Sequence, residues 1–336
     1  MTLRLRGILF VLLVASLPAA CRAAPDCSDP QVFCAALVTD TQGLNDQGFR
    51  QDTWNGLEQS EKKDILGHIA YIESVDARDY GKNIAYFAEA GYDVILTCGP
   101  GLREGTLDAA ERYPHSVFIG IDQTHEEVRT NLVPINFPED QMGFLAGALA
   151  AHLSKTRIVA GLCETSDFDS MWRYCEGFRA GAKYIDGDIE VLIEYREGGS
   201  QEKLFLDEAW GIEHGESMIV QGADVVFGAG GLTGQGALQA ATRAGIFSIG
   251  SERDQAIELG SAGSSVVASV YGHPSTQIQA MLPILREGIL PPPTAGDFTV
   301  ILREALSPEN LKAEIELVQS GLISGSIKTT IPFEKP

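Results

Sequence analysis

The feature that most constrains the fold is a repeated succession of strand-like and helix-like segments that begins at Val32. Near-continuous runs rich in Val and Ile are typical of strands buried on both faces of a parallel sheet. Helical stretches between such strands form right-handed crossovers. In chain order, the first series reads VFCAALVTD, then the helix FRQDTWNGLEQSEKK, then HIAYIES, the helix YGKNIAYFAEAG, YDVILTCG, the helix LREGTLDAAERYP and the strand SVFIGID.

A second series of the same kind follows the helical stretch PEDQMGFLAGALAAHLS. Two similar series predict an α/β fold made of two doubly wound parallel-sheet lobes, with chain segments that cross between them. We assign residues 32–130 and 262–290 to the N-terminal lobe, and residues 131–261 and 291–336 to the C-terminal lobe. Because ligands of open parallel sheets bind at the carboxyl ends of the strands, facing lobes would define a binding cleft.

The first residues have the pattern of a targeting segment. Arg4 and Arg6 precede the apolar run ILFVLLVASL at residues 8–17. This run is too short for a stable membrane anchor, so we predict that residues 1–20 are a signal peptide and that the protein is exported.

Cys21 follows small residues, as the acylated cysteine of a bacterial lipobox does, although Pro18 stands where Leu is usual. We predict a lipoprotein that is anchored in the cell membrane through Cys21, with residues 21–31 as its tether. The alternative is ordinary cleavage near Ala20 or Ala23 and a free protein.

The other cysteines fit an oxidising compartment. Cys27 and Cys34 flank a short turn, and Cys163 and Cys175 lie on the two sides of another, so each pair could form a disulfide. Cys98 ends a buried strand and would stay free. Sequence alone does not decide the connectivity.

Charge and motifs exclude several function classes. The chain has 25 Lys and Arg against 46 Asp and Glu, a net charge of −21, so no nucleic-acid partner is expected. It has no GxSxG, HExxH or CxxC motif and no zinc-ligand spacing. The glycine-rich segment at 228–236 lacks the Lys of a phosphate-binding P-loop. We therefore expect a binding protein rather than an enzyme, with no metal and no cofactor.

Polar and aromatic residues gather where the predicted strands end. Carboxylates accept hydrogen bonds from hydroxyl and ring N–H groups, and aromatic rings stack on flat ligands. Acceptors outnumber cations, so a neutral ligand rich in donors, a nucleoside or a sugar, fits better than a phosphate or an acid. The candidate ligand-binding residues are Asp40, Asn45, Asp46, Phe49, Asp122, Trp172, Phe227, Gly230, Gly231, Glu252, Asp254 and Tyr271.

Each candidate also has a purely structural interpretation. Asp40 and Asp122 could cap the helices that follow them. Phe49 and Phe227 could be ordinary core rings.

An ordered set of motifs resembles one known family. LVTDTQGLNDQGFRQDTWNG, FIGID, NFPEDQMGFLAGALAA, EGFRAGAKYIDGDIEV, QGADVVFGAGGLTGQGALQAA and IGSERDQ are similar to segments of the basic membrane protein (Bmp), or PnrA-like, family. The resemblance covers about Val32 to Lys335. It implies the type I periplasmic-binding-protein fold and an extracytoplasmic lipoprotein that binds purine nucleosides and delivers them to an ABC permease and its ATPase. We expect the protein to be a monomer.

The resemblance also implies residue roles. Asp40 and Asp46 would contact the base, Asp122 would lie near the base edge, and Phe49 and Phe227 would sandwich the purine.

Other positions would face the ribose. Gly230 and Gly231 match a glycine pair near the sugar, and Glu252 stands where the family has an Asp that binds ribose hydroxyls. Tyr271 stands where the family often has a Lys. The departures at Glu252 and Tyr271 do not affect the predicted fold, but they weaken the prediction that the ligand is a standard purine nucleoside.

Two alternatives come from other functional classes. The chain could be a ligand-sensing receptor for a sugar or nucleoside, or a secreted nucleoside or glycoside hydrolase, because a glycosidase needs only two carboxyl groups.

Overall fold

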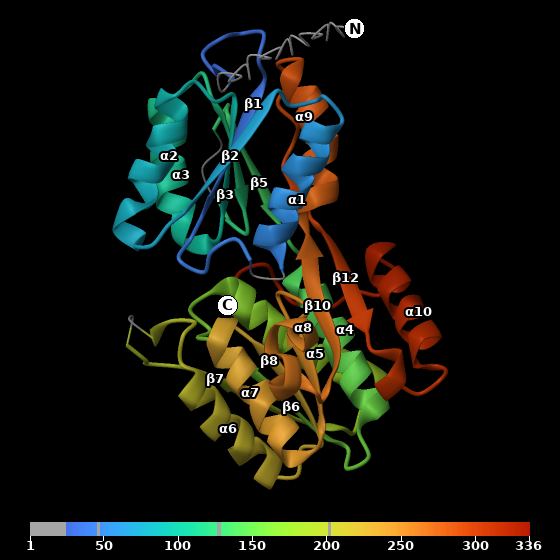
Figure 1. Cartoon of the computed structure of the whole chain (residues 1–336). Coiled ribbons are helices and arrows are strands. Elements are labelled where there is room, and N and C mark those ends of the chain that lie inside the picture. Colours follow the sequence, from blue (N-terminus) through green and yellow to red (C-terminus); the bar gives the residue numbers. More distant parts are fainter. Residues whose placement is uncertain (1–24, 46–47, 126–128, 201–202) are drawn as a thin grey trace, which may run out of the picture.

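The computed structural model describes residues 25–45, 48–125, 129–200 and 203–336. They form two α/β lobes, one above the other, each built on a six-stranded sheet (Figure 1). The strand order is β11-β5-β4-β3-β1-β2 in the N-terminal lobe and β12-β10-β9-β8-β6-β7 in the C-terminal lobe. The same order recurs in both, so the predicted repetition of one doubly wound architecture is confirmed.

The N-terminal lobe contains the first strands of the chain. Its strands pair in parallel, and its edge strand β2 is half-exposed whereas the central strand β1 is buried along its whole length. The elements are β1 (Cys34–Thr39), α1 (Phe49–Lys62), β2 (His68–Glu73), α2 (Tyr80–Glu89), β3 (Val94–Cys98), α3 (Arg103–Arg112), β4 (Val117–Ile121), β5 (Leu132–Asn136), α9 (Pro274–Arg286) and β11 (Thr294–Ala295).

The C-terminal lobe repeats this plan, and only its outer strand β12 runs antiparallel to its neighbour β10. The elements are α4 (Glu139–Leu153), β6 (Ile158–Cys163), α5 (Asp169–Ile185), β7 (Glu190–Tyr195), α6 (Glu208–Val220), β8 (Val225–Ala229), α7 (Gly231–Ala244), β9 (Phe247–Ser251), α8 (Gln255–Leu259), β10 (Val266–His273), β12 (Asp297–Leu302) and α10 (Leu311–Ile323).

The helix α4 is buried almost all round because it packs closely on α5. A Cβ at Gly147 would lie 1.9 Å from the carbonyl oxygen of Phe178, and one at Gly181 would lie 1.8 Å from that of Phe144. Glycine at these positions therefore lets the two helix backbones touch, which explains the small residues in the sequence of α4.

The predicted lobe boundaries need correction. β5 pairs with β4 and therefore belongs to the N-terminal lobe, whereas β10 pairs with β9 and belongs to the C-terminal lobe. β11 also pairs with β5. Residues 131–136, 262–273 and 294–295 were therefore each assigned to the wrong lobe, because a strand's own sequence does not show which strand it will pair with.

The chain crosses between the lobes at three places, after β5, after β10 and after β11. Phe137 follows β5, and its side chain is buried against the other two crossings. A Cβ at Gly272 or at Gly296 would come within 2.3 Å of its ring carbons. These three residues form the packed centre of the hinge.

Both suggested disulfides are present, Cys27–Cys34 and Cys163–Cys175, and Cys98 is buried and takes part in neither of them. Cys21 and the predicted signal peptide lie outside the described residues. Within the described ranges no helix is long and apolar enough to cross a membrane.

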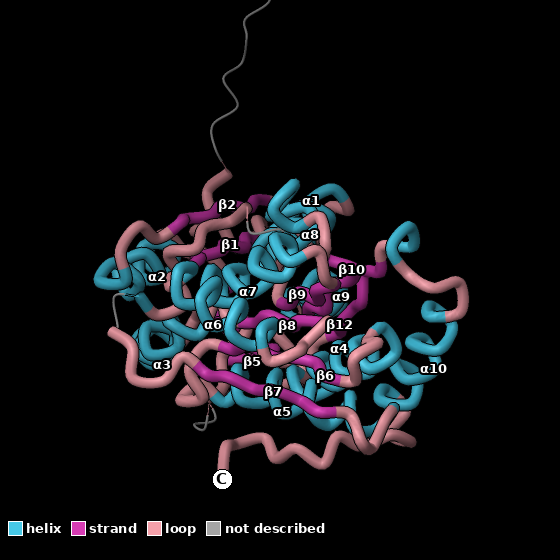
Figure 2. Tube along the Cα trace, turned by 90° about the horizontal axis from the view of Figure 1, so that it is seen from below, coloured by secondary structure: helices cyan, strands magenta, loops and turns pink. Residues whose placement is uncertain are grey.

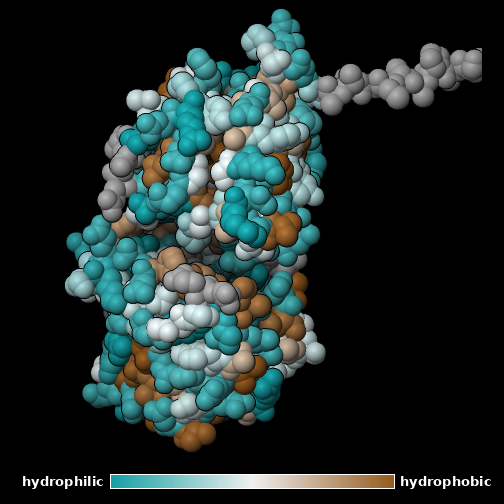
Figure 3. All heavy atoms as spheres, turned by 90° about the vertical axis from the view of Figure 1, so that its left-hand side faces the viewer, coloured by the Kyte–Doolittle hydropathy of each residue, from teal (hydrophilic) through white to brown (hydrophobic). Residues whose placement is uncertain are grey.

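The C-terminal segment runs back along the C-terminal lobe beside α5, as Figure 2 shows from below. The face of the molecule drawn in Figure 3 is mostly hydrophilic, with hydrophobic residues in scattered spots.

Candidate functional site

A cavity of about 200 Å³ lies between the two lobes, at the carboxyl ends of their strands. It is more apolar than polar and adjoins a wider polar space of about 640 Å³, and the two share Pro100, Asp122, Phe168 and Ser170. The N-terminal lobe contributes Asp40, Thr41, Gln42, Phe49, Arg50, Tyr80, Pro100, Gly101 and Asp122, and the C-terminal lobe contributes Phe168, Ser170, Met171, Leu204, Phe205, Leu206, Glu252 and Arg253.

Asp122 and Glu252 are the two lining carboxylates of the cavity that form no ion pair with another described residue. Each follows the equivalent strand of its lobe, β4 or β9, and each has a left-handed backbone, with φ of 56° and 67°. Such strain in non-glycine residues is typical of functional sites. The Glu252 carboxylate accepts a hydrogen bond from the Gly231 N–H at 2.9 Å. Sequence-predicted Glu252 and Gly231 therefore lie together.

The electrostatics of Asp122 are set mainly by burial. Desolvation raises the pKa of its carboxyl to about 6, the Arg50 guanidinium opposes the rise, and the Glu252 carboxylate adds to it. Asp122 can therefore change its protonation state near neutral pH.

Asp40 lies at the end of β1, as predicted, but its carboxylate is already engaged. The Arg50 side chain donates to it from Nε at 2.8 Å and from Nη2 at 2.5 Å, and the Gln42 N–H donates to Oδ1 at 3.0 Å. A Cβ at Gly99 would lie 2.2 Å from Oδ2. Asp40 thus holds Arg50 and has little acceptor capacity left for a ligand.

Arg50 was not among the predicted site residues. It is 1% exposed, and its guanidinium lies 4.5 Å from the centroid of the Phe49 ring. One feature of the sequence could have identified it: Arg50 lies in the first turn of α1, and the strand before that helix is followed by Asp40. Phe49 lines the cavity as predicted, and its other neighbour is Phe137 of the hinge, with ring centroids 6.2 Å apart.

The aromatic wall of the C-terminal lobe consists of Phe168 and Phe205, whose ring centroids are 5.3 Å apart. Neither was predicted, because both follow strands in loops without a regular pattern. Phe205 adopts a left-handed backbone with φ of 61°, and its carbonyl accepts a hydrogen bond from the Leu232 N–H at 2.8 Å.

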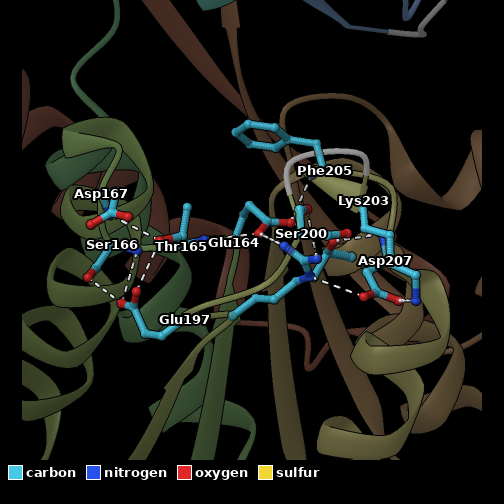
Figure 4. A network of polar contacts seen from close by, with 11 residues as sticks. Glu164, Thr165, Ser166, Asp167, Glu197, Ser200, Lys203, Phe205 and Asp207 are labelled. Atoms are coloured by element: carbon cyan, nitrogen blue, oxygen red, sulfur yellow. Dashed lines mark hydrogen bonds and ion pairs between the residues drawn. The ribbon is translucent and has the colours of Figure 1, made fainter.

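A buried ion network holds the loop of Phe205 in place (Figure 4). Arg196 donates to Glu164 at 3.1 Å and to Asp207 at 3.2 Å, and Glu164 in turn accepts from the Phe205 N–H at 3.0 Å and from Thr233. In Figure 4 the Phe205 ring points away from this network. The network therefore fixes the loop backbone and leaves the ring available to the cavity.

The polar space beside the cavity has a wall made by a second buried ion pair. Arg173 donates to Glu139 from Nε at 2.9 Å and from Nη2 at 2.5 Å, and its Nη1 donates to the Phe333 carbonyl. Lys335 donates to Ser166 at 2.5 Å. The C-terminal segment thus forms part of the cleft wall.

Comparison with known proteins gives the family. Residues 33–274 match the Bmp family, described as ABC transporter substrate-binding protein PnrA-like. The chain belongs to the Bmp family. The family resemblance seen in the sequence is thereby confirmed.

Among its relatives, the ABC transporter nucleoside-binding protein BmpA of Lactococcus lactis subsp. cremoris is 33% identical over 205 residues, 60% of this chain and 56% of that protein. Basic membrane protein A of Borreliella burgdorferi is 30% identical over 219 residues, 63% and 61% of the two chains. The matches therefore span less than two thirds of these relatives.

Solved structures share the fold at low identity. A solute-binding protein of an ABC transporter system from Aeropyrum pernix K1 has a TM-score of 0.68 at 19% identity, covering 88% of this chain and 92% of that one. A similar protein from Conexibacter woesei has a TM-score of 0.69 at 18% identity, covering 90% and 100%. The predicted fold is confirmed.

Phe227 departs from the role that the Bmp resemblance implied. Its side chain is fully buried in the C-terminal lobe and stacks on Phe178, with centroids 5.2 Å apart and planes at 9°. It lies in the middle of β8 and packs against α5, so it does not face Phe49. Phe227 is therefore a core residue. The aromatic rings that the C-terminal lobe contributes to the cavity wall are those of Phe168 and Phe205.

Asp254 and Tyr271 lie away from the main cavity. Asp254 caps α8 by accepting hydrogen bonds from the Ala256 and Ile257 N–H groups. Tyr271 lines a separate surface groove together with Asp254 and His273. Neither residue lines the main cavity, because the Asp254 carboxylate caps α8 and the Tyr271 ring lies in the separate groove, 4.9 Å from the His273 ring.

The remaining predicted residues are dispersed. Trp172, Asn45 and Gly230 do not line the cavity. Gly230 packs closely against Glu164 instead, since a Cβ at Gly230 would lie 2.4 Å from that residue. Asp46 lies outside the described residues. Among the described residues no group of His, Cys, Asp and Glu side chains could hold a metal ion.

Proposed function

We propose that this Bmp family protein is the substrate-binding component of an ABC importer and that it captures a nucleoside in the interlobe cavity. The observation that carries the proposal is an aromatic-walled cavity between two lobes that carries carboxylates from both of them. The name of the Lactococcus relative, a nucleoside-binding protein, supports the ligand class.

The cavity suits a flat, uncharged ligand. Phe49 lies on the N-terminal side, Phe168 and Phe205 lie on the C-terminal side, and stacking on such rings tolerates any base. Asp122 and Glu252 can accept hydrogen bonds from base N–H groups or ribose hydroxyls. Because the two lobes supply different walls, ligand binding would favour their closed arrangement.

The protein would deliver its ligand to a permease and its ATPase from outside the cytoplasm. Export through the segment 1–20 and anchoring through an acylated Cys21 are part of this proposal, as is a monomeric state. Intact-mass measurement of protein purified from membranes tests the anchor, since an acylated Cys21 adds the mass of its lipid.

Thermal unfolding and calorimetric titration test the ligand class. We expect inosine, guanosine or adenosine to raise the Tm of the purified protein, while free sugars and amino acids leave it unchanged. A panel in which sugars raise the Tm and no nucleoside does would reject the nucleoside assignment.

A further inference from the structure

Arg253 is a second guanidinium in the cavity wall, and it comes from the C-terminal lobe. It follows Glu252 at the end of β9, is 8% exposed, and its backbone forms an isolated bridge with Gly48 of the N-terminal lobe. Its side chain lines the same cavity as Phe49 and Phe205.

The hydrogen bonds of Arg253 are incomplete. Its Nη2 donates to Oε1 of Gln42, across the cavity, at 3.2 Å. Its Nε is shielded from solvent and has no acceptor among the described residues. The other buried arginines of the cleft, Arg50, Arg173 and Arg196, each donate to a carboxylate, whereas no described carboxylate lies within ion-pair distance of Arg253.

A buried guanidinium with an unfilled N–H is stabilised by any acceptor that a ligand brings. An anionic ligand is disfavoured, because Asp122 and Glu252 line the same cavity and the charge of Arg50 is neutralised by Asp40. The cavity thus offers a neutral ligand one donor fork and two carboxylate acceptors.

The hydrogen-bonding groups of the two kinds of purine differ on the edge that such a fork would meet. A 6-oxopurine presents two adjacent acceptors, O6 and N7, which a guanidinium binds with two hydrogen bonds, and its N1–H is a donor for a carboxylate. Adenine presents an amino group in place of O6, so its donor would oppose the guanidinium.

We propose that Arg253 is a specificity-determining residue that makes the cavity select 6-oxopurine nucleosides, inosine and guanosine, over adenosine. This inference rests on the proposed function and adds the class of base to it. Gln42 positions the guanidinium, and the contact between them joins the two lobes where the base would bind.

Calorimetric titration of the whole mature protein tests the proposal. We expect inosine and guanosine to bind wild-type protein about ten-fold more tightly than adenosine, and 7-deazaguanosine, which lacks the N7 acceptor, to lose most of that advantage. Arg253→Met should weaken inosine binding by about ten-fold and change adenosine binding by less than about two-fold. Arg253→Lys, which keeps the charge without the fork, should give an intermediate preference.

Arg243→Met is the matched control, because Arg243 forms an exposed ion pair with Glu216 on the surface. Equal affinities of the wild-type protein for inosine and adenosine, or an equal loss of both in Arg253→Met, would overturn the selectivity and leave nucleoside binding intact. Binding of no nucleoside by the wild-type protein would overturn both proposals. If Arg253→Met fails to fold, the proposal is still tested by the wild-type affinities for adenosine and 7-deazaguanosine and by the nucleoside preference of the Arg253→Lys variant.

Discussion

Asp122 and Glu252 occupy the same position in the two lobes, because each directly follows the third strand of its sheet, β4 counted from β11 or β9 counted from β12, and both have positive φ. The pseudo-symmetry of the two sheets therefore brings one carboxylate from each lobe to the same cavity. Neither carboxylate forms an ion pair with any residue that the structure describes, whereas Asp40, which follows β1, pairs with Arg50.

We expect ligand affinity to fall as the pH is lowered from 7 to 5. Burial raises the pKa of Asp122 to about 6, so the carboxyl gains a proton in this interval and can no longer accept hydrogen bonds through both oxygens. Asp122→Asn should reduce affinity at pH 7 and flatten the pH dependence in titrations from pH 5 to 8. An unchanged pH profile in Asp122→Asn would assign the dependence to another group.

The same raised pKa affects stability with a definite sign. Between the unfolded pKa of 3.8 and the folded value of about 6, the folded state keeps a proton that the unfolded state has lost. The Asp122 contribution to the free energy of unfolding therefore decreases as the pH rises through this window and is constant above it. Without ligand, Asp122→Asn should raise the midpoint of urea unfolding at pH 7 and have little effect near pH 4.

The ion pair of Arg50 and Asp40 predicts strong coupling between two substitutions. Arg50→Met leaves the buried Asp40 carboxylate without its cation and should cost about 3–5 kcal/mol of unfolding free energy. Arg50→Met combined with Asp40→Asn should recover much of that loss. Urea unfolding of the single and double variants measures the coupling, with Arg243→Met as the exposed control. Additive effects would show that the pair is unimportant for stability.

Much of the fold could be predicted from the sequence because buried parallel strands have a continuous apolar pattern, as in β1 and β8. The lobe assignment of β5 and β10 could not, since strand pairing is a long-range property. Asp122, Glu252 and Phe49 were found because strand ends converge at the cleft. Arg50 was missed because its position fits the pattern of an ordinary helix. Phe168 and Phe205 were missed because they lie in irregular loops, and the position of Phe205 depends on the Glu164–Arg196 ion pair, a contact between distant parts of the chain.

Phe205 and Phe227 provide the sharpest test of the corrected aromatic wall. Phe205 is half-buried at the cavity, so Phe205→Ala should weaken nucleoside binding by about 1–3 kcal/mol with a small change in the free energy of unfolding. Phe227 is buried against Phe178, so Phe227→Ala should cost about 3–5 kcal/mol of stability.

Urea unfolding and calorimetric titration of both variants separate these two effects. Phe298→Ala, on the outer strand β12 away from the cavity, serves as the control for binding. If Phe227→Ala abolishes binding in a protein of unchanged stability, while Phe205→Ala binds as the wild type does, the second aromatic wall would belong to Phe227 after all, and the lobes would have to close on the ligand in a different arrangement from the one described.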